Sequence, residues 1–276
     1  MDVDLFIPDL RKICLDAGDA IMDVYQRDDF DIQAKGDNSP VTAADLAAHR
    51  IIEQGLSQLN PTIPQLSEEA DDISFSVRQH WDLFWCIDPL DGTKEFIRRN
   101  DEFTVNIALI QSGQPILGII HLPTSKETWW GGPRIGAWKQ EANGNVRAIQ
   151  SRSLGDTLIV TASRRHGQEQ NDRLLVKLAS RFNNVESLAS GSSLKMCLIA
   201  EGKADLYPRL FPTSEWDTAA AQAIVEAAGG KLVHAENLQP LKYNQQESLI
   251  NPFFYVVGDP DFPLHALAST RDSSTS

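Results

Sequence analysis

The sequence predicts an α/β protein in which helices pack on β-sheets. Apolar residues at spacings of three and four near the N-terminus indicate an amphipathic helix. The apolar run at 83–87 is too short for a helix and indicates a buried strand. From residue 158 onward, strand-like and helix-like segments alternate, which is typical of layered α/β proteins. Ligands of such proteins are expected where the strands end.

Two helices are expected before the first strand. The apolar face of the first helix is formed by positions 10, 13, 17, 21 and 24. Residues 37–40 then form a typical turn sequence. A second helix is expected to start at Thr42, which together with Asp45 forms a capping-box pattern, and to end before Pro61. The strand at 83–87 follows, after a polar segment.

The strands and helices beyond this point fall into two groups. Paired strands are expected at 103–110 and 116–120, around a turn at Gly113. The later segments are expected to be strand, helix, strand, helix, strand and helix, the clearest of them at 158–161, 170–182, 192–201, 204–207 and 219–228. Gly229-Gly230 ends the last helix.

We expect a single domain at residues 1–266. The change of pattern near residue 153 suggests an N-terminal lobe at 1–153 and a C-terminal lobe at 154–266. The polar residues at 267–276 are expected to form a disordered tail.

The composition excludes several classes of protein. A formal net charge of −13 argues against a broad surface for nucleic-acid polymers, although a metal cluster would still allow a small anion to bind. No apolar stretch is long enough to span a bilayer, and the N-terminus lacks the basic flank of a signal peptide. Cys14, Cys86 and Cys197 form no CxxC pair, so we expect reduced thiols in a cytoplasmic protein.

The segment 88–96, D-P-L-D-G-T-K-E-F, is the strongest functional signal. Asp88 and Asp91 follow the apolar strand, and we expect them in a tight loop that Pro89 stiffens and Gly92 allows to turn. A lone D-x-x-D would more often be a turn that caps the next helix. The added Pro, Gly and Thr favour a metal site, and oxygen ligands favour Mg²⁺ over zinc.

Other acidic residues could complete such a site. Glu68, in the acidic loop 67–72, could bind a cation or polarise a water, although an acidic loop is usually only solvated. Asp217 could be a metal ligand or a first-turn acid that complements the dipole of the last helix. For Asp45, capping is the better first interpretation. Asp37 has no helix to serve, which leaves more room for a role in the site.

A possible anion site lies further downstream. The sequence at 191–195, G-S-S-L-K, opens a predicted helix, and helix N-termini bind anions through free N–H groups. Arg209 follows a predicted strand. For these residues alone, a surface lysine at Lys195 and a serine N-cap are more probable than a ligand pocket.

Taken together, these segments resemble the Mg²⁺-dependent, lithium-sensitive phosphatases of the inositol monophosphatase superfamily. The pattern E-E … D-P-L-D-G-T … W-D-x-A-A … A-G-G matches in order and spacing over nearly the whole chain. The resemblance implies a layered αβαβα fold and two or three Mg²⁺ ions. The implied metal ligands are Glu68, Asp88, the carbonyl of Leu90, Asp91 and Asp217. The N–H groups of Gly92 and Thr93 would hold the phosphate.

Within the superfamily the chain looks most like the CysQ-type 3′(2′),5′-bisphosphate nucleotidases. Segments 35–42, 94–97, 102–106, 191–197 and 204–209 carry this likeness. The resemblance implies that Asp37, Thr93 and Glu68 activate the attacking water. The implied substrate contacts are Glu68, Leu90, Asp91, Gly92, Thr93, Lys94, Ser192, Lys195, Arg209 and Asp217.

The expected activity is hydrolysis of adenosine 3′,5′-bisphosphate to AMP and phosphate, with the sulfated nucleotide as a possible second substrate, in sulfate assimilation and nucleotide recycling. One alternative is an inositol or sugar monophosphatase on the same scaffold. Another, less favoured, is a non-catalytic metal- or nucleotide-binding protein. The expected partner is a small phosphorylated nucleotide, for a monomer or homodimer. Peripheral association with the inner membrane stays open, although no basic amphipathic helix supports it.

Overall fold

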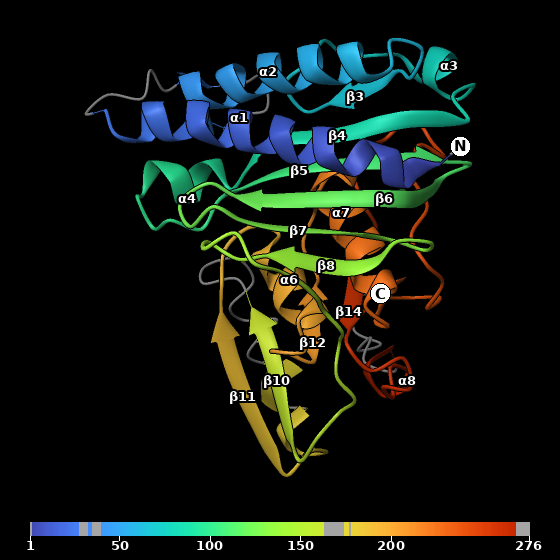
Figure 1. Cartoon of the computed structure of the whole chain (residues 1–276). Coiled ribbons are helices and arrows are strands. Elements are labelled where there is room, and N and C mark those ends of the chain that lie inside the picture. Colours follow the sequence, from blue (N-terminus) through green and yellow to red (C-terminus); the bar gives the residue numbers. More distant parts are fainter. Residues whose placement is uncertain (1, 28–32, 35–39, 163–173, 177, 269–276) are drawn as a thin grey trace.

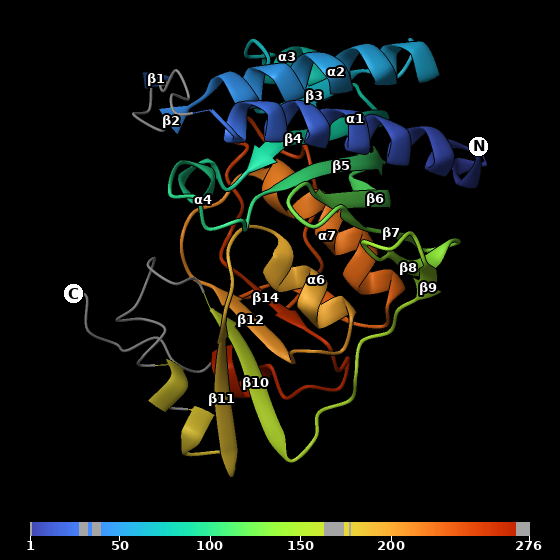
Figure 2. The same cartoon turned by 60° about the vertical axis from the view of Figure 1, so that its left-hand side comes forward.

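Two β-sheets with a pair of helices between them organise the computed structural model of this chain (Figure 1; Figure 2). The structure describes residues 2–27, 33–34, 40–162, 174–176 and 178–268. Two more helices cover the outer face of the larger sheet, and further helical segments pack on the outer face of the smaller one. This alternation of helical and sheet layers confirms the predicted layered α/β fold.

The outer helices α1 (Ile7–Tyr25) and α2 (Ala43–Leu59) lie side by side across the larger sheet (Figure 1). A short 3-10 helix, η1 (Val3–Phe6), precedes α1. The predicted capping box of α2 is confirmed, with Thr42 as N-cap and Asp45 as its partner. Between the two helices, β1 (Gln33–Ala34) and β2 (Pro40–Val41) form a small ribbon.

The larger sheet has seven strands in the order β3-β4-β5-β6-β7-β8-β9. Only β3 and β4 are parallel, and the other neighbours are antiparallel. The predicted hairpin between β5 and β6 turns at Ser112 and Gly113, both with positive φ. The strands are β3 (Gln65–Ser67), β4 (Leu83–Asp91), β5 (Thr104–Gln111), β6 (Gln114–Leu122), β7 (Glu127–Gly132), β8 (Gly136–Gln140) and β9 (Val146–Ala148).

Both faces of the larger sheet are buried, which explains why the strand at 83–87 is apolar throughout. Trp85 and Ile87 pack in the same cluster as α1 and α2, whereas Phe84 and Cys86 pack in the cluster that contains the middle helices. Successive side chains of a strand point to opposite faces, so a strand between two helical layers needs apolar residues at every position.

The middle layer consists of α6 (Leu194–Ala200) and α7 (Glu215–Ala227). Helix α7 begins at Glu215, because Ser214 and Asp217 form a capping box there, so Asp217 lies in its first turn as predicted. It also packs very closely on the larger sheet. A Cβ added to Gly118 of β6 would lie 2.1 Å from the carbonyl oxygen of Ala220. The glycine therefore lets the helix rest directly on the sheet, beside the strands that lead to the site.

The smaller sheet has the order β11-β10-β12-β14-β13, with parallel pairs on one side and antiparallel pairs on the other. The described part of the predicted helix at 170–182 is helical at 174–176 and 178–179, and the residues before 174 lie outside the described ranges. The strands are β10 (Thr157–Ala162), β11 (Asn184–Ala189), β12 (Leu206–Arg209), β13 (Lys231–His234) and β14 (Phe254–Val257).

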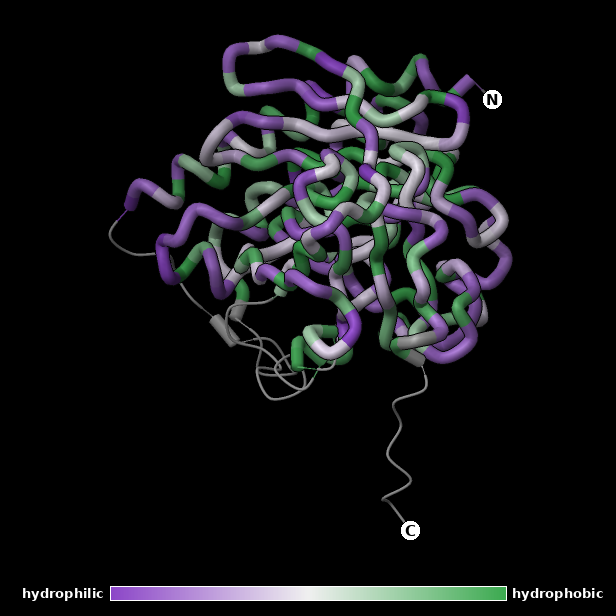
Figure 3. The backbone as a smooth tube through the Cα atoms, turned by 90° about the horizontal axis from the view of Figure 1, so that it is seen from below, coloured by the Kyte–Doolittle hydropathy of each residue, from purple (hydrophilic) through white to green (hydrophobic). Residues whose placement is uncertain are grey.

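The predicted tail begins too early. Residues His265–Ala268 form helix α8, and Leu267 is buried against the smaller sheet because it completes an apolar cluster there. Residues 269–276 lie outside the described ranges. In Figure 3, hydrophilic stretches of the chain follow much of the periphery. Cys14, Cys86 and Cys197 are all buried free thiols. Among the described helices, none combines the length and the apolarity that crossing a bilayer requires.

Candidate functional site

The motif at 88–91 is a continuation of strand β4 and not the loop that the sequence predicted. Asp88 pairs with Asn106 of β5 and Asp91 pairs with Thr104, so an extra residue of β4 bulges between the two pairs. The N–H of Leu90 donates to Asp88 Oδ1 at 3.0 Å, which fixes that carboxylate within the bulge. A bulge redirects side chains without ending the strand, and such bulges are frequent beside active sites.

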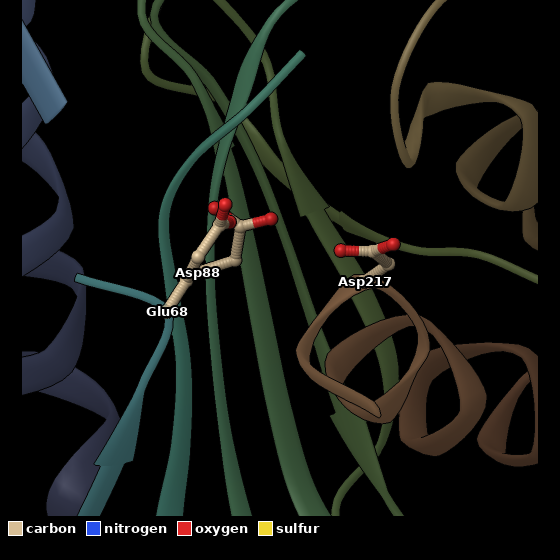
Figure 4. A group of neighbouring side chains, drawn as sticks. All are labelled: Glu68, Asp88 and Asp217. Carbon is tan, nitrogen blue, oxygen red and sulfur yellow. The ribbon is translucent and has the colours of Figure 1, made fainter. Parts of the chain in front are cut away.

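Glu68, Asp88 and Asp217 converge from three elements (Figure 4). One carboxylate oxygen of each lies within 4.8 Å of the others. Glu68 follows β3, and its N–H donates to the carbonyl of Ile87 at 3.1 Å, which places it beside Asp88. Asp217 approaches from the first turn of α7, where Asp217 Oδ2 accepts a hydrogen bond from the N–H of Ser214 at 2.9 Å. Asp217 therefore serves the helix N-terminus, as one interpretation predicted, and also lies in the carboxylate cluster, while its role as a metal ligand stays a prediction.

The carboxylates of this cluster repel one another. Burial raises the pKa of Asp88 well above its usual value, and the charges of Glu68, Asp91, Asp217 and Asp45 raise it further. Burial raises the pKa of Asp217 to about 8, with further contributions from Asp91 and Glu68. A bound divalent cation would remove this penalty, because it turns repulsion among the carboxylates into attraction. The donor set is oxygen only, which suits Mg²⁺.

Asp91 lies next to this cluster and at the edge of a pocket. The pocket brings together residues from both sheets and from α6 and α7. Its lining consists of Asp91, Gly92, Glu95, Gly191, Ser192, Ser193, Lys195, Met196, Tyr207, Arg209, Thr213, Asp217, Thr218 and Phe254. Of the predicted substrate contacts, Asp91, Gly92, Ser192, Lys195, Arg209 and Asp217 are therefore in one place. Lys94, in helix α4 (Thr93–Ile97), is exposed and does not line this pocket.

Lys195 is not the surface lysine that its local sequence suggested. It is 4% exposed, and its Nζ donates to the carbonyl oxygens of Ser192 at 2.7 Å and Ser190 at 3.2 Å. Burial lowers the pKa of Lys195 to about 8, an effect that Asp91 opposes and Arg209 reinforces. The ammonium group therefore keeps most of its charge at neutral pH and loses it as the pH rises through about 8.

Arg209 reaches the same pocket from the end of β12. Its Nη2 donates to the carbonyl of Pro212 at 3.2 Å, and its Nη1 lies 3.5 Å from the hydroxyl of Tyr207. Its Nε is buried and has no hydrogen-bond partner among the described residues. A buried donor without a partner costs free energy, so this guanidinium is suited to an anionic ligand.

Thr93 is paired with Asp45 in the described part of the chain. Its hydroxyl donates to Asp45 Oδ1 at 3.1 Å, while Asp45 Oδ2 accepts from the N–H and the hydroxyl of Thr42 at 2.7 and 2.6 Å. Asp37, the predicted partner of Thr93, lies outside the described residues. Gly92, at φ +96°, starts the turn between Asp91 and Thr93. A Cβ there would lie 3.2 Å from the carbonyl oxygen of Glu102, so the turn requires glycine in both conformation and space.

Several site residues were missed in the sequence. Asn106 and Ser193 are buried beside Asp91, and the Tyr207 hydroxyl lies 3.5 Å from Arg209 Nη1. One signal was available for Asn106. It follows Thr104 at a spacing of two within an apolar strand, so both polar side chains had to lie on one face. Ser193 offered no comparable signal, because a serine before a helix is most simply a cap.

Comparison with known proteins adds independent evidence. Residues 5–264 match the profile of the Inositol monophosphatase family. The 3′(2′),5′-bisphosphate nucleotidase CysQ of Escherichia coli (strain K12) is 48% identical over 246 residues, which cover 89% of this chain and 96% of that protein. The CysQ of Buchnera aphidicola subsp. Acyrthosiphon pisum is 43% identical over 252 residues, covering 89% and 92% of the two chains.

Solved structures agree. The crystal structure of CysQ from Bacteroides thetaiotaomicron, described as a bacterial member of the inositol monophosphatase family, superimposes with a TM-score of 0.79 at 41% identity, covering 89% of this chain and 94% of that one. An inositol monophosphatase from Anabaena (Nostoc) sp. PCC 7120 gives a TM-score of 0.75 at 23% identity, covering 97% and 96%. At that identity the second comparison supports the fold alone.

Proposed function

This chain belongs to the inositol monophosphatase family, and from that premise we propose that it hydrolyses adenosine 3′,5′-bisphosphate to AMP and phosphate. The sulfated form of this nucleotide is a proposed second substrate, which would place the enzyme in sulfate assimilation and nucleotide recycling. Two relatives that carry the name bisphosphate nucleotidase align with this chain over 96% and 92% of their own length, which supports the proposal.

The observation that carries the substrate assignment is the position of two positively charged side chains. Lys195 and Arg209 line the same pocket as Asp91 and Asp217. A nucleotide with two phosphates needs one phosphate at the carboxylate cluster, where the bond is cleaved, and a cationic surface for the other. The two side chains supply that surface, and the buried Nε of Arg209 supplies an unused donor. Ser192 borders the same pocket and would contact the nucleotide beside them.

The carboxylate cluster fits the magnesium ions that the family implies. We propose that Glu68, Asp88, Asp91, Asp217 and the carbonyl of Leu90 hold two or three Mg²⁺ ions. Magnesium, when bound, supplies positive charge to the phosphoryl oxygens and acidifies water at the site. The N–H groups of Gly92 and Thr93 would also bind the phosphoryl oxygens.

The water that attacks phosphorus would be held by Thr93. Because the Thr93 hydroxyl donates its proton to Asp45, its oxygen lone pairs are turned toward other donors, and a water can donate to them. As the water oxygen bonds to phosphorus, the water passes a proton to the Thr93 oxygen while the Thr93 hydroxyl passes its own proton to Asp45, with Glu68 as an alternative acceptor. The bond between phosphorus and the ribose oxygen breaks, and that oxygen takes up a proton from a solvent water. Asp37 stays a prediction from the resemblance.

Inositol or sugar monophosphate hydrolysis on the same scaffold is the alternative. A compact polyol phosphate has no second phosphate for Lys195 and Arg209. The free-energy cost of burying these two side chains would then not be offset by substrate binding. We also propose that the protein works in the cytoplasm, where its three buried thiols stay reduced. Peripheral association with the inner membrane stays a prediction. The oligomeric state, a monomer or a homodimer, does so too.

A panel of phosphate substrates tests this proposal. With saturating Mg²⁺, kcat/KM for adenosine 3′,5′-bisphosphate should far exceed that for inositol 1-phosphate. In the Arg209→Met variant, KM for the bisphosphate should rise about tenfold or more, because a charged hydrogen bond is lost, while kcat/KM for the monophosphate changes little. Faster turnover of inositol 1-phosphate by the wild-type protein would contradict the substrate assignment.

Lys195 predicts a pH dependence of substrate binding. The pKa of Lys195 lies at about 8, so the pocket loses a positive charge as the pH rises through this value. We expect KM for the bisphosphate to rise above about pH 8, by up to about tenfold per pH unit. The substrate phosphates are already fully ionised there, since their second pKa is about 6. Initial rates between about pH 6.5 and about pH 9.5 measure how KM changes with pH.

The Lys195→Met variant is the control for this prediction. Its KM should be high and should not change across the same range, because no charge remains to titrate. A wild-type KM that is flat with pH, or an equal rise in the variant, would contradict the assignment.

A further inference from the structure

Ser193 connects two segments that carry proposed metal ligands. Its side chain is buried, with 1% exposure. Its Oγ donates to Asp91 Oδ2 at 2.7 Å and lies 3.1 Å from the backbone carbonyl of Asp217, a second acceptor for the same proton. Asp91 belongs to the bulge of β4 and Asp217 to the first turn of α7. One hydroxyl thus bridges two elements that are 126 residues apart in the sequence (217 − 91 = 126).

The hydroxyl is itself oriented by β5. Asn106 Nδ2 donates to Ser193 Oγ at 2.9 Å and lies 3.5 Å from Asp91 Oδ2. The amide is fixed from behind, because Thr104 Oγ1 donates to Asn106 Oδ1 at 2.9 Å. The Ser193 oxygen accepts from Asn106, and the acceptors in reach of its proton are Asp91 Oδ2 and the carbonyl of Asp217. The network is therefore directional.

The same serine is the end of the turn that lines the pocket. Lys195 holds the carbonyls of Ser190 and Ser192, and Glu102 Oε2 accepts from the N–H of Gly191 at 2.8 Å. Ser192 is held at φ +40°, a left-handed conformation that is unfavourable for serine. The residues 190–193, which we call the pocket turn, are thus constrained at several points. Through Ser193, this turn is joined to Asp91.

We propose that Ser193 is a positioning residue that orients Asp91 and the start of α7 for the cations and couples them to the pocket turn. Hydrogen bonds to the carboxylates that bind a metal fix their orientation, and losing such a partner typically reduces metal affinity or activity about 10- to 100-fold. The link to the nucleotide rests on the proposed function of the pocket, whereas the link to the cation does not. Occupancy of the cluster and order of the pocket turn are therefore thermodynamically linked.

The test is the Mg²⁺ affinity of the substrate-free protein, measured by calorimetry. In Ser193→Ala we expect Mg²⁺ binding to weaken at least about tenfold. Saturating Mg²⁺ should also raise the affinity for AMP by a smaller factor in this variant than in the wild-type protein. The matched control is Ser190→Ala. Ser190 lies in the same turn and is equally buried at 6% exposure, but its hydroxyl only lies 3.5 Å from the carbonyl of Gly191. Its Mg²⁺ affinity should stay within about twofold of wild type.

A second substitution protects the test against misfolding. Ser193→Cys keeps nearly the same volume but replaces the hydroxyl by a weak donor, so it should show the same loss of Mg²⁺ affinity with a cooperative thermal transition. Wild-type Mg²⁺ affinity in either Ser193 variant, or an equal loss in Ser190→Ala, would overturn the proposal. Failure of the wild-type protein to hydrolyse the bisphosphate would overturn only the proposed function, because Mg²⁺ binding is measured without substrate.

Discussion

Asp88→Asn is expected to abolish turnover while leaving the fold intact. Asp88 is 1% exposed in the bulge of β4 and lies within the carboxylate cluster. The amide is nearly isosteric and can still accept from the N–H of Leu90, but it removes the charge that a cation needs. Several kcal/mol of transition-state stabilisation depend on that cation, so kcat/KM should fall by at least about a thousandfold.

The stability of the variant separates a metal role from a structural one. Burial and neighbouring carboxylates raise the pKa of Asp88, so its ionised form is disfavoured in the metal-free protein. In EDTA, Asp88→Asn should therefore melt at the wild-type temperature or above it, whereas added Mg²⁺ should no longer raise the melting temperature. Asp82→Asn, at an exposed residue just before β4 begins, is the control and should keep full activity. Wild-type turnover in Asp88→Asn would exclude the metal assignment.

Asp45→Asn is expected to have the second largest effect, a loss of about a hundredfold or more in kcat. The amide can keep its oxygen toward Thr42 and so preserve the helix cap. Its NH₂ group would then face Thr93 and donate to the hydroxyl, which reverses the hydrogen bond that turns the Thr93 lone pairs toward water. KM should change little, and Mg²⁺ affinity should fall far less than kcat, because neither the pocket nor the cluster loses a ligand and only one neighbouring negative charge is removed. Steady-state kinetics combined with Mg²⁺ titration measure this split.

Thr42→Ala provides the comparison for Asp45. It removes the hydroxyl that bonds to Asp45 Oδ2 and the capping contact to the N–H of Ala44, but it leaves the bond between Thr93 and Asp45 in place. We expect it to cost about 1 kcal/mol of stability, as N-cap removal usually does, with little loss of kcat. If Thr42→Ala lost as much activity as Asp45→Asn, Asp45 would act only as a cap.

Local sequence predicted the elements well wherever one physical rule dominated. The spacing of apolar residues in α1 and the capping box of α2 gave the helix type and its start, because both depend on residues three or four positions apart. The bulge in β4 was predicted as a loop, since Pro and Gly usually interrupt strands. It stays in the sheet because β5 continues to pair with Asp88 and Asp91 on either side.

The candidate site was only partly predictable. The motif around Asp88 identified the chemistry, and its spacing to Glu68 and Asp217 identified the superfamily. The local sequence alone suggested a surface position for Lys195, because nothing in G-S-S-L-K reveals that the middle layer between two sheets covers it, whereas the family resemblance implied a substrate contact. Asp45 was expected only to cap α2, since the position of Thr93 relative to that helix depends on how α2 packs on β4.

From the sequence alone, periodicity predicted helices and strands of an α/β protein, and the family resemblance of its short motifs implied the layered fold and the acidic residues of a proposed metal site. The tertiary structure decided which side chains meet. Thr93 donates a hydrogen bond to Asp45, the side chains of Lys195 and Arg209 line one pocket, and Ser193 lies between Asp91 and Asp217. Such contacts join residues tens to hundreds of positions apart. They depend on the packing of helices against two sheets, which no local pattern encodes.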